Sequence, residues 1–125
     1  MEKPGFVVRP EGLHTYCPPR HKSTINRKLI GSDTVGAKNM EVILGEVESE
    51  GLAETHYHDV AEQALYLLEG RCLVEVEGES QEMKPGDMAF FAPGKRHKVV
   101  PLGGPIKIIV VYSPPLPDVA IGFRT

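Results

Sequence analysis

Glycine and proline cut this chain into segments so short that few folds remain open to it. The 125 residues include 13 glycines and 11 prolines. Between them lie runs of about four to eight residues that are rich in β-branched and aromatic side chains: QALYLLEG, CLVEVEG, DMAFFAPG, HKVVP and IKIIVVYSPP. Such runs, bounded by turn residues, predict strands, and many short strands with close turns indicate a sandwich or a barrel.

One segment competes with this interpretation. DVAEQALYLLEG is long enough for about three turns of helix, but it has no polar face after Gln63. Gly70, followed directly by another β-like run, suits a hairpin better. The sequence therefore predicts an all-β chain.

Charge and hydropathy exclude several classes of protein. The net charge is −3, and no basic cluster is longer than PGKRHK, so nucleic acid is not an expected partner. No apolar run approaches the roughly 20 residues of a membrane helix, so no membrane association is expected. The first residues, MEKPGFVVRPEG, lack the apolar centre of a signal peptide. We expect a cytoplasmic protein.

The chain divides into three parts. Residues 1–35 are less periodic and are expected to form an arm whose strands join the barrel or a dimer partner. Residues 36–115 would form the barrel, and residues 116–125 a C-terminal tail. A homodimer is expected, in which the arm covers an open sheet edge of the neighbour. Cys17 and Cys72 form no CxxC pair, and the grouping TYCPPRH, with His14 and His21 close by, is interpreted as extended chain rather than as a metal site.

The stretch THYH places two histidines one residue apart. On a strand, residues i and i+2 point to the same side about 6.5–7 Å apart. His56 and His58 would then present two imidazoles to one divalent ion. Two ligands do not make a site, so further donors must come from elsewhere in the chain.

Two residues are candidates for these further donors. Gln63 shares strand parity with Leu65 and Leu67, which must point inward if the core is dry. Glu62 would be the better ligand chemically, but it faces the opposite way. His97, which follows GDMAFFAPGKR, is the candidate fourth donor.

These residues carry a family resemblance. GLAETHYHDVAEQALYLLEG, from Gly51 to Gly70, resembles the first conserved motif of the cupin superfamily, and GDMAFFAPGKRH resembles the second. The resemblance implies a double-stranded β-helix, a jelly-roll barrel of two antiparallel sheets. It also implies that one divalent transition metal (Fe, Mn, Ni, Co, Cu or Zn) is held by His56, His58, Gln63 and His97.

The sequence departs from the family pattern at several positions. Gln63 stands where the family usually has a glutamate, and only four residues separate Gly51 from His56. Ala92 replaces the first proline of the second motif, and Pro101 stands where asparagine is frequent. With Gln63 in place of glutamate, all four ligands are neutral.

Strand parity also predicts what would surround the metal. The inward sets are uncharged: Leu65 and Leu67; Cys72, Val74 and Val76; Ile106, Ile108, Val110 and Tyr112. Tyr112 is the one candidate for a catalytic or substrate contact. The pocket would suit a small, partly apolar ligand that chelates metal.

Three functions are compatible with these features. The first is a metal-dependent enzyme, a dioxygenase or another catalyst of a metal-assisted reaction on a small chelating organic substrate. The second is a non-catalytic barrel, with or without metal, that binds or senses a small molecule. The third is a structural barrel that has lost its metal, which the missing glutamate suggests. The constellation of four residues favours the first.

Overall fold

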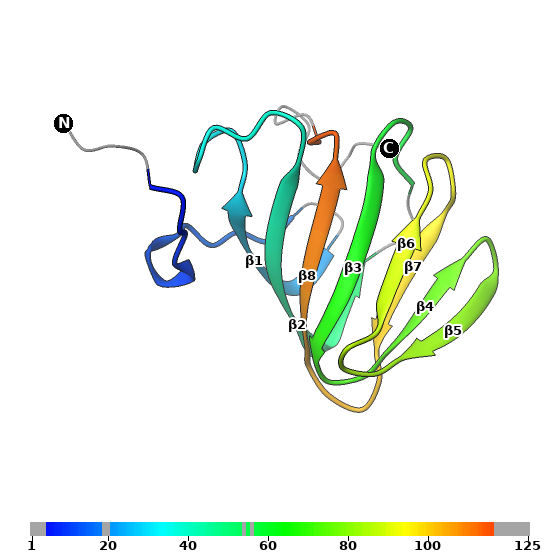
Figure 1. Cartoon of the computed structure of the whole chain (residues 1–125). Helices are drawn as coiled ribbons and strands as arrows, with labels where there is room; N and C mark the ends of the chain where they lie inside the picture. Colours follow the sequence, from blue (N-terminus) through cyan, green and yellow to red (C-terminus); the bar gives the residue numbers. More distant parts are fainter. Residues whose placement is uncertain (1–4, 19–20, 54, 56, 117–125) are drawn as a thin grey trace.

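The structure is a computed structural model that describes residues 5–18, 21–53, 55 and 57–116 (Figure 1). Its elements are the short 3-10 helix η1 (Pro10–Gly12) and the strands β1 (His21–Ile30), β2 (Glu41–Ala53), β3 (Glu62–Glu69), β4 (Cys72–Val76), β5 (Glu79–Met83), β6 (Met88–Phe91), β7 (His97–Pro101) and β8 (Ile106–Ser113). The expectation of an all-β chain is confirmed. The segment that competed as a helix forms strand β3.

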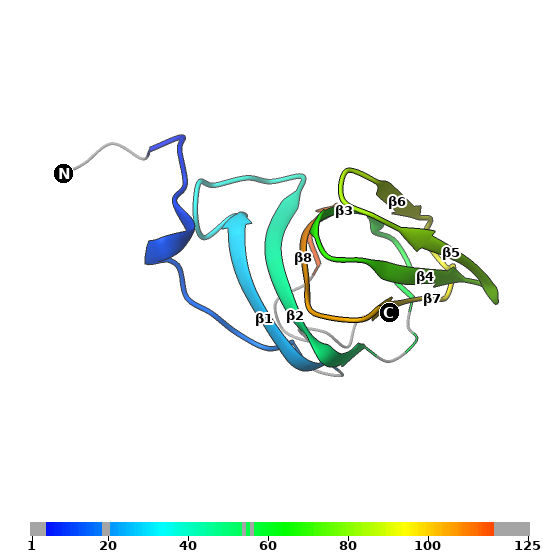
Figure 2. The same ribbon diagram turned by 90° about the horizontal axis from the view of Figure 1, so that it is seen from below.

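The strands form two antiparallel sheets. The larger sheet has the order β1-β2-β8-β3-β6, and the smaller has the order β5-β4-β7. Seen from below in Figure 2, the two sheets curve around a common interior, the jelly-roll arrangement that the resemblance implied. None of the helices in the described residues is long and apolar enough to cross a membrane.

The hydrophobic core lies between the two sheets. The inward parity predicted from the sequence is confirmed: Leu65 and Leu67 are buried on β3, and Cys72 and Val74 on β4. On β8, Ile106, Ile108 and Val110 close the core from the larger sheet. Because each strand contributes at most three buried side chains among the described residues, the core depends on contacts between distant parts of the chain.

Gly70 connects the two sheets, since β3 ends just before it and β4 begins two residues later. Its φ is +89°, in the region that favours glycine. A Cβ atom there would lie 2.4 Å from the carbonyl oxygen of Pro105. Any side chain at this position would therefore be strained both by its backbone conformation and by its neighbour.

The N-terminal segment joins the larger sheet. Strand β1, which falls within the stretch expected to form an arm, pairs antiparallel with β2. Tyr16 continues the pairing through a bridge with Asn26. On the inner side of these strands Lys28 forms an ion pair with Glu41, with Nζ 3.0 Å from Oε2. Strand β1 thereby covers one side of the interior in which the candidate site lies. Of the expected C-terminal tail, residues 117–125 lie outside the described residues.

Candidate functional site

A row of inward-facing side chains crosses the larger sheet near one end. Strand register places Tyr112 of β8 opposite Glu41 of β2 on one side and opposite Gln63 of β3 on the other. Gln63 is in turn opposite Phe91 of β6. Directly opposed residues of an antiparallel pair share a face and lie close together. The row therefore brings Gln63 and Tyr112, both named from the sequence, to adjacent positions.

Gln63 is buried, with 6% of its surface exposed. Its side-chain Oε1 accepts no hydrogen bond from any residue within the described part of the chain. Glu62, the alternative ligand, is exposed on the opposite face. A buried amide oxygen without a donor costs about 1–3 kcal/mol, so its retention here points to a ligand that the chain itself does not provide.

His58 lies in a loop rather than on a strand. Strand β2 ends at Ala53 and β3 begins at Glu62, and no described residue between them is in a strand. The expectation that THYH forms a strand is therefore wrong for this part, because the chain must turn here between two strands of the larger sheet. The loop is held by the Gly94 amide, which donates to the His58 carbonyl oxygen at 2.8 Å. His56 lies outside the described residues.

His97 begins β7 and is buried against the larger sheet. Its ring stacks on Phe91, with centroids 4.2 Å apart and an angle of 6° between the planes. Its Nδ1 lies 3.1 Å from the Lys95 carbonyl oxygen. A carbonyl can only accept, so Nδ1 carries the proton, and in the neutral ring Nε2 keeps the lone pair that a metal would bind.

His58 and His97, the two candidate ligands among the described histidines, face each other. The ring centroids of His58 and His97 are 5.6 Å apart, and the rings are tilted by 46°. Tyr112 meets the His58 ring edge-on, with centroids 5.3 Å apart. Burial raises the pKa of Tyr112 above its usual value of 10, and the nearby Tyr16 and Glu41 add to this. The phenol therefore stays protonated at neutral pH and can act as a donor.

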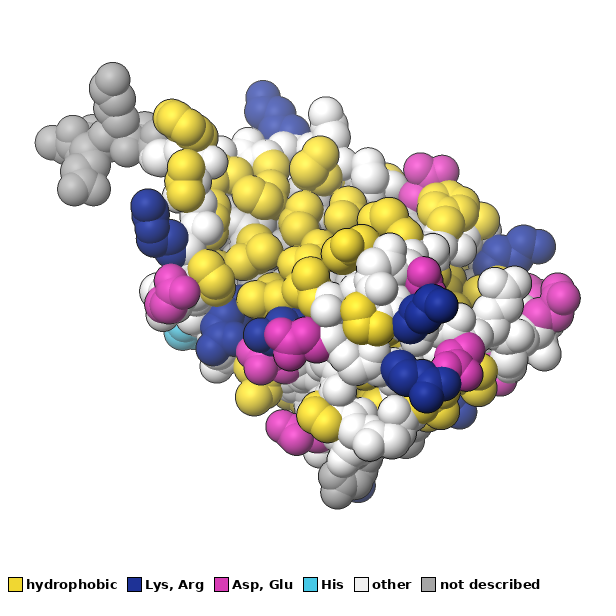
Figure 3. All heavy atoms as spheres, turned by 60° about the horizontal axis from the view of Figure 1, so that its bottom comes forward, with side chains coloured by type: hydrophobic (Ala, Val, Ile, Leu, Met, Phe, Trp, Pro, Cys, Tyr) yellow, Lys and Arg dark blue, Asp and Glu magenta, His cyan; other side chains and the backbone are white. Residues whose placement is uncertain are grey.

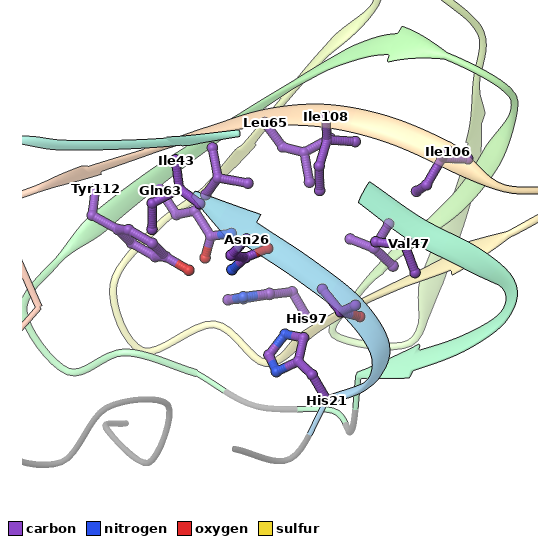
Figure 4. Close-up of a pocket in the computed structure, with 13 residues that line it drawn as sticks. His21, Asn26, Ile43, Val47, Gln63, Leu65, His97, Ile106, Ile108 and Tyr112 are labelled. Carbon is purple, nitrogen blue, oxygen red and sulfur yellow. The ribbon is translucent and has the colours of Figure 1, made fainter. Parts of the chain in front are cut away.

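A cavity of about 70 Å³ is lined by Gln63, His97 and Tyr112, whereas His58 is not among its lining residues. In Figure 4 the Gln63 amide and the Tyr112 hydroxyl point toward the space beside the His97 ring. Most of the wall is aliphatic: Ile43, Val47, Leu65, Val99, Ile106, Ile108 and Val110. Leu65 and the three β8 residues belong to the predicted inward sets, whereas the predicted β4 set, Cys72, Val74 and Val76, does not line the cavity, and neither does Leu67. Of the described residues, no Asp, Glu, Lys or Arg lines this cavity. The space would hold roughly five water molecules, so it admits only a small group.

His21 also lines the cavity, next to Thr24 and Asn26. The sequence placed this histidine in the arm, away from the site. In Figure 4 its ring lies on the side of His97 away from Gln63. Only the pairing of β1 with β2 brings it there, and nothing in the local sequence signals that pairing.

Glu41 is a second residue that the sequence did not single out. It is 6% exposed and faces inward. Its Oε2 pairs with Lys28, and its Oε1 accepts a hydrogen bond at 3.0 Å from the Leu116 amide. Both oxygens are thus engaged, which suits a structural role behind Tyr112. Alternation along residues 40–47 separated two faces but did not show which one is inward.

The donors present fit a transition metal in kind. Two imidazoles and one amide oxygen are neutral N and O donors, which suit first-row divalent ions. Within the described ranges, no group of three or more His, Cys, Asp or Glu side chains could hold an ion. The described donors are His58, Gln63 and His97, and the fourth ligand implied by the family resemblance, His56, is outside these ranges.

Comparisons with known proteins agree with this architecture. The family model described as a cupin domain matches residues 43–112. The chain is 29% identical over 114 residues to the tetracenomycin polyketide synthase protein TcmJ of Streptomyces glaucescens, covering 88% of this chain and 74% of that protein. The structure resembles the polyketide cyclase RemF of Streptomyces resistomycificus with a TM-score of 0.73 and 26% identity, covering 92% of this chain and 80% of that one.

A more distant likeness concerns the fold alone. KdgF of a Halomonas species superposes with a TM-score of 0.79 at 18% identity, covering 92% of this chain and 98% of that one. The two sheets, the order of the two motifs along the chain and the match over residues 43–112 lead to one assignment. The chain belongs to the cupin superfamily.

Proposed function

We propose that this protein is a metal-dependent enzyme whose substrate is a small organic molecule with two neighbouring oxygens, of the β-dicarbonyl type. His58, Gln63 and His97 would hold the ion together with His56. The observation that carries the proposal is the buried Gln63 Oε1, which accepts no hydrogen bond from the described residues. A bound cation would supply the partner that this oxygen lacks.

The ligand set would influence the chemistry of the metal. Bound by neutral donors, a divalent ion keeps its charge of about +2 and acts as a Lewis acid on a carbonyl or enolate oxygen. Because no anionic ligand contributes, we expect weaker metal binding than a glutamate in place of Gln63 would give. Fe, Mn, Ni, Co, Cu and Zn are all compatible with these donors.

The chain itself would orient and shield the substrate. The Tyr112 hydroxyl, which is protonated at neutral pH, would donate a hydrogen bond to a substrate oxygen. The aliphatic wall would exclude water from an enolate. His21 lines the same cavity and would contact the substrate from the side of β1.

The names of two relatives favour one reaction class over another. TcmJ is named a polyketide synthase protein and RemF a polyketide cyclase. Polyketone chains carry carbonyls in the β relation, and their cyclisation forms a carbon–carbon bond from an enolate without an oxidant. This supports condensation chemistry rather than a dioxygenase reaction. A cavity of about 70 Å³ would enclose only the reacting end of such a chain.

Metal content, measured by elemental mass spectrometry on untagged protein, tests the proposal. We expect about one equivalent of a transition metal in the native chain. It should be lost in His58→Ala and retained in His14→Ala, since His14 is exposed and lies outside the cavity lining. The chelating β-diketone 2,4-pentanedione would then shift the absorption spectrum of protein loaded with Cu or Ni. Absence of metal after reconstitution with each of the six ions would contradict the proposal.

A non-catalytic binding barrel is the second candidate. It is favoured by the scarcity of general bases in the lining: within the described residues no Asp, Glu or Lys lines the cavity, and His21 is the remaining imidazole beside the candidate ligand His97. A β-diketone that raises the melting temperature but is recovered unchanged, without oxygen uptake, would favour this function. Conversion of the diketone with oxygen uptake would instead favour a dioxygenase.

A further inference from the structure

Strand β1 supplies polar side chains to the cavity wall. The family model matches residues 43–112, and the described candidate metal ligands lie inside that match. His21, Thr24 and Asn26 of β1 also line the cavity, although β1 lies before the matched residues. Function depends on the particular side chains that a fold carries at its site. Contacts from β1 can therefore give this chain a selectivity of its own without changing the metal donors.

An irregularity in β1 aims His21 into the cavity. Regular alternation along a strand would place Lys22 on the same face as Thr24 and Asn26. The pairing with β2 shifts between Lys22 and Thr24, and Ser23 between them has a φ of +52°. As a result His21 lines the cavity and Lys22 is exposed. A non-glycine residue at positive φ is strained, and irregularities of this kind often re-aim a side chain beside a functional site.

The Asn26 side chain is held by Tyr16. The two residues exchange both backbone hydrogen bonds, Tyr16 N to Asn26 O at 3.0 Å and Asn26 N to Tyr16 O at 2.8 Å, so they lie directly opposite each other. Burial raises the pKa of the Tyr16 phenol, and a hydrogen bond with the Asn26 side chain acts in the opposite direction. An amide has this effect on a phenol when it donates to the phenol oxygen. The contact therefore restrains the orientation of the Asn26 amide.

Gly45 leaves the room that the Asn26 amide occupies. It lies opposite Asn26 on β1 and opposite Ile108 on β8. A Cβ atom at this position would lie 3.0 Å from the Asn26 Oδ1 and 3.2 Å from the Ile108 Cγ1. Both distances are shorter than an ordinary van der Waals contact. A side chain at position 45 would therefore displace the amide and fill the space between Asn26 and Ile108.

The Asn26 amide adds a hydrogen-bond donor to a largely aliphatic wall. In the view of Figure 4 it lies between the Gln63 amide and the His97 ring. Asn26 is partly exposed, whereas Gln63 and His97 are buried, so its amide lies nearer to solvent than the candidate metal donors do. An amide nitrogen carries two hydrogens. When one of them is donated to Tyr16, the other can be donated to a ligand in the cavity.

We propose that Asn26 is a specificity-determining residue whose amide donates a hydrogen bond to a substrate oxygen other than the two bound to the metal. The inference rests on the proposed metal-dependent function and adds the residue that recognises the substrate beyond its chelating oxygens. A site built to hydrogen-bond a substrate group discriminates against an analogue that lacks the group. A ligand with a third oxygen beyond the chelating pair should therefore be preferred.

Two probe ligands of equal carbon-chain length test this. 2,4-Heptanedione and 2,4,6-heptanetrione differ only in the third carbonyl group. Their dissociation constants are measured by isothermal titration calorimetry on protein loaded with Ni, and the metal content is determined in parallel by elemental mass spectrometry. The preference for the trione over the dione should be about 5-fold smaller in Asn26→Leu than in the native chain, since one neutral hydrogen bond contributes about that factor. Intrinsic differences between the probes cancel in this comparison.

Two further variants act on the same amide. Asn26→Asp keeps the shape of the side chain, but an ionised carboxylate cannot donate, so the preference for the trione should be lost there as well. This variant decides the question if Asn26→Leu does not fold. Gly45→Ala should reduce the preference by a smaller factor, about 2-fold, because its Cβ displaces the Asn26 Oδ1.

The control is Thr24→Val. Thr24 lines the same cavity, but its Oγ1 already donates to the Lys22 carbonyl oxygen at 3.2 Å. Its variant should keep the native preference for the trione. A purely structural role of Asn26 would weaken the binding of both probes alike. A chain with one equivalent of metal and the same preference in the native protein and in the Asn26 variants would therefore overturn the inference and leave the proposed function standing. A chain that takes up no metal would overturn the proposed function and this inference with it.

Discussion

The two faces of the larger sheet depart from the usual pattern in opposite directions. An antiparallel sheet commonly buries an apolar face and exposes a polar one. Here the buried face carries Glu41, Gln63 and Tyr112 in one row, whereas the outer face presents apolar side chains (Figure 3), among them Leu44, Ile109 and Phe90. Folding of one chain alone favours neither feature, because a buried polar group and an exposed apolar group both cost free energy.

The comparison of the two faces distinguishes residues that stabilise the fold from residues whose placement the fold alone does not explain. Leu65, Leu67 and Cys72 are buried apolar residues, and the fold alone accounts for them. The fold of one chain does not account for Gln63 inside or for Phe90 outside. For Gln63 the proposed ligand is a metal ion, which can be removed without touching Phe90.

The largest effect expected from a single substitution is on the inner side of β3. Leu67→Ala should lower the free energy of unfolding by about 2–5 kcal/mol, because it leaves a cavity in the core. Leu68→Ala, one residue on and 38% exposed, should lower it by less than about 1 kcal/mol in the monomer. Urea denaturation at low protein concentration measures both values. Similar losses at the two positions would show that both faces of β3 are buried even in a single chain.

A smaller change in the free energy of unfolding, of opposite sign, is expected from a substitution at Gln63. Gln63→Met keeps the side-chain length and removes the buried amide, so the metal-free protein should gain about 1–2 kcal/mol of unfolding free energy. The same variant should bind metal more weakly. Denaturation in the presence of a chelator, with metal content measured in parallel, checks both statements. A loss of stability without metal would mean that the chain itself satisfies the amide.

The smallest expected effect is a decrease in folding stability at alkaline pH. Burial raises the pKa of Cys72 from 9.0 to about 11. Above pH 9 the unfolded chain releases this proton while the folded chain keeps it, so stability falls as pH rises, by about 1 kcal/mol at pH 10. Below pH 9 both states hold the proton and the contribution is flat.

The Cys72 effect is isolated by comparing slopes of stability against pH. Cys72→Ala should flatten the slope between pH 9 and 10, whereas Cys17→Ala should not, because Cys17 is exposed. Equal slopes in Cys72→Ala and the native chain would mean that Cys72 titrates alike in both states.

The sequence predicted most of the strands, the inward residues of β3, β4 and β8 and part of the cavity wall, because these follow from alternation within each run. Gln63 was preferred to Glu62 on parity, and Gln63 is the one that faces inward. Local patterns do not contain the pairing between distant strands. Glu41, which lies opposite Tyr112, and His21, which lines the same cavity, were therefore missed, since only the pairing of β1, β2 and β8 brings them to the site.

The histidine pair shows another limit of local patterns. A spacing of two residues is meaningful on a strand, but residues 57–60 form a loop. His58 is positioned instead by its contact with Tyr112 and by the turn that precedes His97. The resemblance implied the residues of the candidate site, which stay a prediction, while the assumed strand geometry was wrong for His58.

The hydrogen bond between Gly94 and His58 gives the site an internal reporter of motion. It joins the loop that carries one histidine to the turn that precedes the other. An amide exchanges its hydrogen with solvent only when its hydrogen bond opens. The exchange rate of the Gly94 amide therefore measures how often the His58 loop detaches from the barrel, whether or not a metal is bound.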